Sequence, residues 1–388
     1  MCRFIRAFAC ITLLLLVGCG EESGGSDTNC DSGTHEENGQ CVANKDMPDT
    51  TEPDTIVEDI SEPDTNEPDT NEPDIAEPDI AEPDTNAPKQ QFPLYFSTMT
   101  HLEGGVPYES NEKMFNNVIV KLEGAMALAS KYDAMMTIES EKPFATACVD
   151  FNRNFLAEVL AAGHGVGTHC DIGVPKPNQT TLEEFTANGA ENKGLVDALV
   201  GPENNLGCSG GGGYVDWVQG LKGAGFSYTN GAVGMSYLCM DDSSLPDGMT
   251  KQYIKVFESH APAPFELMDR IYVRMLKDGA DFKHDAEGGL VLLGGGLGRP
   301  DAQFNNEEDK TFTMEDVDAL IATVQAVDKD RDPGRFARIN VHLSVEHLLP
   351  RNSKVLEYFY SSLQKLQQEG TIQWETEAGT YQAYMDSL

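Results

Sequence analysis

The sequence predicts an α/β fold, a distorted (β/α) barrel of seven or eight strands that occupies residues 92–388. Short apolar runs typical of buried strands alternate with amphipathic stretches typical of helices through most of this region. No second low-complexity segment interrupts it, so we expect one large domain. This many alternating strands favour a closed barrel over an open, doubly wound sheet.

Each expected strand is an apolar run of four to six residues. These runs cover residues 94–99, 134–138, 165–169, 205–208, 226–230, 289–293, 339–343 and 371–375. The amphipathic stretches between them have apolar residues at helical spacing. They cover residues 111–132, 152–162, 214–224, 314–327 and 353–369.

Residues 1–18 are typical of a lipoprotein signal peptide. Arg3 and Arg6 precede the apolar run 7–17, which is too short to span a membrane comfortably. The run closes on the tetrapeptide LVGC, which ends at Cys19 and resembles a bacterial lipobox. The resemblance implies lipidation of Cys19, and hence anchoring to the bacterial outer membrane or cell surface. An ordinary signal peptide followed by a chance cysteine is the alternative.

Export implies an oxidising compartment, so the cysteines are expected to form disulfides. In the short segment 19–45, Cys30 and Cys41 flank a polar loop and are the expected pair. Four more cysteines in the main domain suggest two disulfides, with three pairings open: Cys148, Cys170, Cys208 and Cys239. The alternative is that Cys170, beside His169, is a nucleophile or a metal ligand.

From their composition, we expect residues 46–91 to form a disordered, acidic, proline-rich linker. The segment repeats EPDT and EPDI, with sixteen acidic residues and no basic one between positions 46 and 88. Frequent proline favours extended polyproline II, which would span on the order of 100 Å at about 3.1 Å per residue. A calcium-binding role is the alternative, although the repeat lacks the glycine turn of a dedicated loop.

The net charge argues against nucleic acid as a partner. The formal charge of the chain is −37, and −18 of it remains in residues 89–388 after the linker and the N-terminal segments are set aside. A surface of this sign repels polyanions. We expect a monomer.

Three polar positions at the ends of expected strands predict a divalent-metal site. His101 and Glu103 lie two residues apart just beyond the first apolar run, so an extended chain points both side chains to one face. His169 ends the segment GHGVGTHCD, in which a helix leads into a strand. Because the carboxyl ends of barrel strands meet at one face, we expect His101, Glu103 and His169 to bind the ion together. His342 lies inside an apolar strand with no obvious structural reason to be histidine.

The motifs resemble those of the polysaccharide deacetylase superfamily of carbohydrate esterases. GHGVGTH is similar to the family's second motif, VHL at 341–343 to its leucine-x-histidine motif, and GTIQWETEAGTYQAYMDSL to its last strand and helix. The resemblance covers most of residues 94–388. It implies a distorted (β/α) barrel that binds a divalent metal and removes acetyl groups from sugars.

The sequence also departs from the family's pattern. The first motif normally has adjacent aspartates where this chain has THLEGG, and position 173, where the second motif places another histidine, is Gly173. The resemblance therefore implies a rearranged ligand set or a partly lost site. With a metal bound, zinc being the expected ion, we assign the general base to Asp171 and the general acid to His342.

Three functions follow from this pattern. The leading one is a surface-anchored, metal-dependent hydrolase of carbohydrate, most simply an N- or O-deacetylase. The second is a catalytically inactive carbohydrate-binding lipoprotein, and the third is a metal-dependent glycoside hydrolase that uses His101 and Glu103.

Overall fold

The structure is a computed structural model that describes two units of the chain, Met1–Ala81 and Glu82–Leu388. The described residues are 34–37, 40–43, 90–170, 180–210, 215–230, 268–280, 282–300 and 312–388, with the single positions 238, 241, 243, 245, 250 and 251. In the first unit, β1 (Thr34–Glu37) and β2 (Gln40–Ala43) form an antiparallel hairpin. The signal peptide, Cys19, Cys30 and residues 46–89 of the linker lie outside the described residues. Among the described helices, none combines the length and apolarity needed to cross a membrane.

The second unit is built on a sheet whose strands run parallel in the order β10-β3-β4-β5-β6-β7-β9. These strands are β3 (Leu94–Leu102), β4 (Thr137–Ser140), β5 (Gly165–His169), β6 (Gly207–Ser209), β7 (Tyr228–Asn230), β9 (Leu290–Leu293) and β10 (Ala337–His342). The short strand β8 (Arg274–Leu276) pairs antiparallel with β9. A further strand, β11 (Ile372–Trp374), pairs with the start of β3.

The residues after β9 close this sheet into a barrel. The Asn340 N–H donates to the Gly295 oxygen at 2.9 Å, and the Leu297 N–H donates to the Asn340 oxygen at 2.8 Å. Gly295 has a φ of +82°, and a Cβ there would lie 1.8 Å from the Arg338 carbonyl oxygen, so only glycine allows this approach. The prediction of a distorted (β/α) barrel of seven or eight strands is confirmed, with seven strands around the ring among the described residues.

The distortion of the barrel comes from β3, which changes partners along its length. Its first three residues pair with both β10 and β11, whereas residues 99–102 pair with β4. β11 thus occupies the place beside β3 that β4 would take in a regular barrel.

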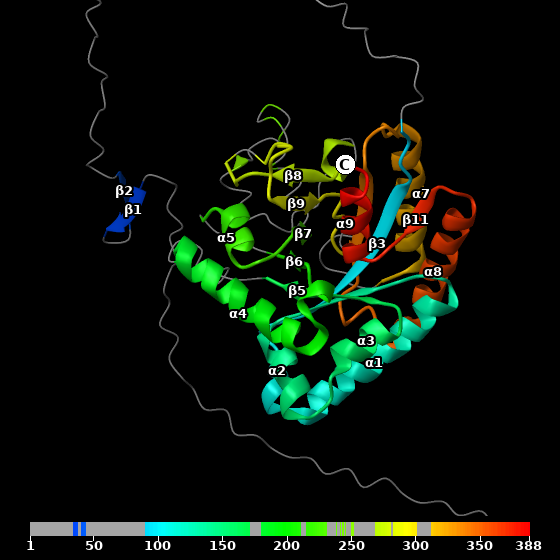
Figure 1. The fold of residues 1–388 in the computed structure, drawn as a ribbon, viewed down its shortest axis with the longest axis horizontal. Helices are drawn as coiled ribbons and strands as arrows, with labels where there is room; N and C mark the ends of the chain where they lie inside the picture. Colours follow the sequence, from blue (N-terminus) through cyan, green and yellow to red (C-terminus); the bar gives the residue numbers. More distant parts are fainter. Residues whose placement is uncertain are drawn as a thin grey trace, which may run out of the picture. The chain divides into compact units, whose positions relative to one another are not determined.

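Helices surround the strands (Figure 1). They are α1 (Glu112–Lys131), α2 (Lys142–Asp150), α3 (Phe155–Ala161), α4 (Leu182–Val200), α5 (Trp217–Gly223), α7 (Met314–Asp330), α8 (Ser353–Gln368) and α9 (Glu377–Met385). Short 3-10 turns lie at η1 (Tyr108–Ser110), η2 (Pro202–Asn204), η5 (Met268–Ile271) and η6 (Pro350–Asn352). At the start of several helices, a side chain accepts a hydrogen bond from one of the first backbone N–H groups, as in the Thr181–Glu184 capping box of α4.

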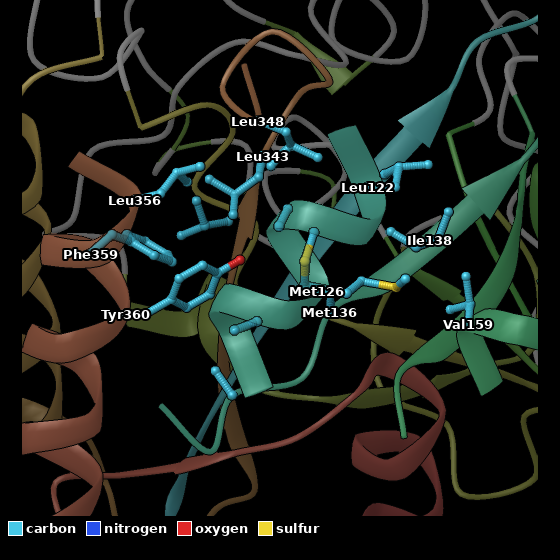
Figure 2. Close-up of a cluster of buried hydrophobic side chains, with 14 of the residues drawn as sticks. Leu122, Met126, Met136, Ile138, Val159, Leu343, Leu348, Leu356, Phe359 and Tyr360 are labelled. Carbon is cyan, nitrogen blue, oxygen red and sulfur yellow. The ribbon is translucent and has the colours of Figure 1, made fainter. Parts of the chain in front are cut away.

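The main hydrophobic core lies between the outer face of the strands and the helices. Leu122 and Met126 of α1 pack with Ile138 of β4 and with Phe359 of α8 in one buried cluster (Figure 2). Residues alternate along each strand, so Ile138 faces the helices while Thr137 and Glu139 face the barrel interior. Each fully buried leucine or phenylalanine contributes about 1.5–3 kcal/mol of transfer free energy to this core.

The amino-terminal end of the barrel is filled by polar groups. Helix α9 contacts β3, β5 and β9, and brings Glu377 of its first turn against Arg338 of β10 at 2.5 Å. Both side chains are fully buried. Arg338 also donates to Ser97 at 2.9 Å and to Asn230 at 2.9 Å. Arg338 thus joins α9 to strands β3 and β7 inside the barrel.

All eight expected strands are present, and three elements were not expected. Strand β8 is only three residues long, and helices α2 and α4 were not predicted, although each covers the outside of the sheet.

The two disulfides expected in the main domain are not both present. Cys170 and Cys208 are bonded, with Cα atoms 5.8 Å apart, and link the ends of neighbouring strands β5 and β6. Cys148 is a free thiol buried on α2, and burial raises its pKa to about 11. The expectation of two bridges is therefore wrong for Cys148, which packs as a small apolar residue. Cys239 lies outside the described residues.

Candidate functional site

Five strands end on polar side chains that point into the barrel at its carboxyl end. They are His101 of β3, Glu139 of β4, His169 of β5, Ser209 of β6 and His342 of β10. The register pairs His101 with Glu139 and His169 with Ser209 on adjacent strands. Because side chains at paired positions of parallel strands lie on the same face, these groups meet.

An inner group forms around the hydroxyl of Ser209. Its Oγ lies 3.0 Å from His101 Nε2 and 3.2 Å from His169 Nδ1, and it donates a short hydrogen bond to Glu139 Oε2. His101 Nε2 lies 3.0 Å from the same carboxylate oxygen. All four side chains are buried, so this group is closed to solvent.

An outer group lies on the other side of the His169 ring. His169 Nε2 is 3.3 Å from Glu103 Oε2 and 3.6 Å from Glu141 Oε1. Glu103 is 49 % exposed and Glu141 is 16 % exposed, so this group opens to solvent. His101 Nδ1 lies 3.8 Å from Glu103 Oε1, the other oxygen of the same carboxylate.

Backbone contacts hold the outer carboxylates in place. The Glu141 N–H donates to the Leu102 oxygen at 3.2 Å and ties together the segments that follow β3 and β4. The Glu141 carboxylate lies over Gly104, where an added Cβ would be 1.8 Å from its Oε2. Any side chain at position 104 would displace that carboxylate.

Glycines make room for the inner group. Gly165 and Gly167 alternate with outward-facing residues along β5, and a Cβ on Gly167 would lie 3.2 Å from the Glu139 side chain. On β6, a Cβ at Gly207 would lie 1.9 Å from the Tyr228 ring. Gly165 and Gly167 of GHGVGTH therefore serve packing inside the barrel.

The three histidine rings of the site are stacked. The ring centroids of His101 and His169 are 3.8 Å apart, and those of His101 and His342 are 4.2 Å apart. Burial lowers the pKa of His342 well below its ordinary value, and the charges of His101 and His169 lower it further. Its Nε2 is buried and has no hydrogen-bond partner among the described residues. His342 is therefore neutral at pH 7.

The pKa of Glu139 is shifted in the opposite direction to that of His342. Burial raises its pKa to about 7, while the Ser209 hydrogen bond and the His169 charge act in the other direction. A carboxyl group with this pKa can hold or release a proton near neutrality.

Both groups have the donor atoms of a divalent-metal site. The inner one offers His101, Glu139 and His169, and the outer one offers Glu103, Glu141 and His169, with the ligand atoms of each group within 4.8 Å of one another. Imidazole nitrogen with carboxylate oxygen is the donor set of catalytic zinc sites, which keep one position open. The outer group fits this requirement better because it reaches solvent, whereas Ser209 already fills the centre of the inner group.

Comparisons with known proteins bear on the fold. The search of solved structures finds a predicted polysaccharide deacetylase from Mycobacterium smegmatis, with 10% identity, a TM-score of 0.50, and coverage of 77% of this chain and 92% of that one. The domain has the polysaccharide deacetylase fold. A scan against family models and a search of curated proteins match nothing.

Two further solved structures resemble this deacetylase-fold domain less well. A 4-alpha-glucanotransferase from Thermococcus litoralis has 10% identity and a TM-score of 0.46, covering 75% of this chain and 40% of that one. A mutant of a CE4 family pseudoenzyme has 11% identity and a TM-score of 0.34, covering 74% of this chain and 67% of that one.

Within the deacetylase fold, the structure brings four of the five predicted site residues together. His101, Glu103, His169 and His342 meet at the carboxyl end of the barrel. Asp171 lies outside the described residues. His164, which precedes β5, is remote from this end and accepts a hydrogen bond from the Met136 N–H at 3.1 Å.

Sequence reasoning missed Glu139, Glu141 and Ser209. Glu139 and Glu141 repeat on β4 the spacing that identified His101 and Glu103 on β3. The signal was present, but the expected strand ended at residue 138, so both glutamates were left out of it. Ser209 begins a glycine-rich stretch, and nothing local indicates that its hydroxyl reaches two other strands.

Proposed function

We propose that the chain is a metal-dependent hydrolase that removes acetyl groups from carbohydrate. The observation that carries the proposal is the outer group, in which His169 Nε2 faces Glu103 and Glu141 at the solvent-accessible mouth of a barrel with the deacetylase fold. We assign a divalent cation, zinc, to these three residues. His101, which approaches Glu103 at 3.8 Å, is the fourth candidate ligand.

A divalent cation held by these residues would lower the pKa of a bound water and polarise the acyl carbonyl. The residues around it handle protons and orient the substrate. His342 begins the reaction as a neutral imidazole, because burial lowers its pKa, so it must first receive a second proton, the one released by the attacking water, before it can give a proton to the leaving group. Asp171 remains the proposed second carboxylate, which takes a proton from the attacking water.

Metal content tests the site. The purified full-length chain should bind one zinc ion per molecule, measured by elemental analysis after dialysis, and His169→Ala and Glu103→Gln should lose it. His284→Ala is the matched control, because His284 is exposed and belongs to neither group. A wild-type chain that stays metal-free after zinc supplementation would rule out the metal-dependent reaction.

Product analysis separates the deacetylase from its alternatives. Acetate released from N- or O-acetylated oligosaccharides, without new reducing ends, supports the deacetylase, whereas new reducing ends indicate the glycoside hydrolase. Binding of oligosaccharide without either product indicates the inactive carbohydrate-binding lipoprotein. His342→Gln should lower kcat on the order of 100-fold while the metal content stays at the wild-type level, as expected for a proton-transfer residue.

We also propose that the chain is exported and anchored through a lipid on Cys19. The support is the LVGC tetrapeptide directly after an apolar run, followed by a long acidic, proline-rich segment. Detergent phase partitioning of the protein from cells tests it: the wild type should enter the detergent phase, and Cys19→Ser should not.

A further inference from the structure

The hydroxyl of Ser209 is surrounded by more partners than it has hydrogens. Glu139 Oε2, His101 Nε2 and His169 Nδ1 all lie within hydrogen-bond distance of its Oγ. A serine hydroxyl supplies one hydrogen and two lone pairs. An ionised carboxylate only accepts, so the hydrogen of Ser209 goes to Glu139.

The direction of this bond determines the direction of the others. With its hydrogen committed to Glu139, Ser209 Oγ can only accept from the two imidazoles. His169 must therefore have its hydrogen on Nδ1, and His101 must have its hydrogen on Nε2. In a neutral His169 ring, the lone pair is then on Nε2, the nitrogen that faces Glu103 and Glu141.

We infer that Ser209 and Glu139 are positioning residues that fix the tautomer of His169 so that Nε2 is presented to a cation. This inference rests on the proposed function for the identity of the ligand. The inner group then has a supporting role. The Glu139 carboxylate acts on the His169 imidazole through the Ser209 hydroxyl, and the cation binds outside the inner group. Supporting hydrogen bonds of this kind typically account for about 10–100-fold in metal affinity.

The opposite tautomer shows why the arrangement matters. A hydrogen on Nε2 would be donated to Glu103 or Glu141, and the outer group would be satisfied without a cation. By holding the hydrogen on Nδ1, Ser209 leaves three acceptor atoms facing one another. A cation can bind between these atoms.

Ser209→Ala tests the inference, with two reference variants. Ser209→Thr keeps the hydroxyl, and Ser97→Ala removes an equally buried serine hydroxyl from the amino-terminal end of the same barrel. The full-length chain is stripped of metal at pH 8. Zinc affinity is then measured by competition with a chromophoric chelator, and urea unfolding checks that each variant is folded.

Ser209→Ala should weaken zinc binding by about 10–100-fold, while Ser209→Thr and Ser97→Ala should bind zinc close to the wild-type affinity. Long-range ¹H–¹⁵N correlation NMR of the metal-free chain gives a second readout. His169 should have its hydrogen on Nδ1 in the wild type and Ser209→Thr, and should shift toward Nε2 in Ser209→Ala.

Unchanged zinc affinity in a folded Ser209→Ala chain would overturn the inference, and so would a His169 that keeps its hydrogen on Nδ1 in that variant. The NMR measurement needs no metal. A wild-type chain that binds no zinc would therefore contradict the proposed function, while the tautomer would still be decided independently by the spectra.

Discussion

The two ends of this barrel hold buried polar clusters of opposite construction. At the amino-terminal end, every nitrogen of the Arg338 guanidinium donates to an acceptor, and its charge is matched by Glu377. At the carboxyl end, three carboxylates, of Glu103, Glu139 and Glu141, meet stacked imidazoles. The first cluster pairs one cation with one carboxylate, whereas the outer part of the second brings two carboxylates to one imidazole nitrogen.

This difference separates a structural cluster from a functional one. Both contain buried charge at the ends of parallel strands, so burial alone does not distinguish them. The balance of donors and acceptors does distinguish them. A cluster whose donors and acceptors match stabilises the fold, whereas a cluster with an excess of acceptors at a solvent-accessible mouth is a candidate ligand site. The predictions below alter one cluster at a time.

The largest effect is expected at the amino-terminal end. Arg338→Met leaves Glu377 buried without its partner, and the loss of one member of a buried pair costs about 3–5 kcal/mol. Urea unfolding should show this loss, and the double variant Arg338→Met/Glu377→Leu should recover much of it because no charge remains buried. A single variant as stable as the wild type would show that the pair is not a structural unit.

The disulfide at the carboxyl end should have the next largest effect. Cys170 follows His169 and Cys208 precedes Ser209, so the bond holds together the two strand ends that carry these side chains. Replacing both cysteines by serine should lower the free energy of unfolding by about 2–4 kcal/mol, because the bond closes a loop with a sequence separation of 38. Wild-type protein unfolded with a reductant present should match the variant. Equal stability with and without the reductant would contradict this expectation.

Local sequence patterns predicted the barrel strands but only half of the site. Alternation and apolar runs are set by neighbouring residues, so each strand could be predicted from its own segment. The contact between His101 and Glu139 depends instead on the register of two strands that are far apart in the sequence. No local pattern encodes that register. The apolar residues 134–136 moved the expected strand ahead of β4, and Glu139 and Glu141 were missed for that reason.

His342 and Cys148 show when a local sequence pattern reveals the environment of a residue and when it does not. A histidine in an otherwise apolar strand stands out because burying it needs a reason, and His342 does stack on His101. A cysteine in a helix gives no such signal, since a buried thiol packs like a small apolar side chain. Counting cysteines predicted a partner for Cys148 that the structure does not give it.

A smaller effect is expected in the pH dependence of stability. Burial raises the pKa of Glu139 to about 7 in the folded chain, against 4.5 for the exposed group, so the folded state binds this proton more tightly. Its contribution is present below pH 4.5 and is lost as the pH rises toward 7. In metal-free protein, the decrease in unfolding free energy between pH 5 and pH 8 should be about 1–3 kcal/mol smaller in Glu139→Gln than in the wild type. Parallel pH profiles for the two proteins would show that Glu139 titrates normally.

The smallest expected change compares two adjacent glycines at the mouth of the barrel. Gly104→Ala places a methyl group where the Glu141 carboxylate lies, so the carboxylate must move away from His169, whereas a Cβ at Gly105 meets nothing within 4 Å. Because the displaced group is the end of a flexible side chain, both variants should keep the free energy of unfolding of the wild type. Zinc affinity should decrease by about tenfold in Gly104→Ala alone, an effect of about 1.4 kcal/mol at the ligand site. Equal zinc affinities for the two variants would place Glu141 outside the metal site and leave Glu103 and His169 as its remaining ligands.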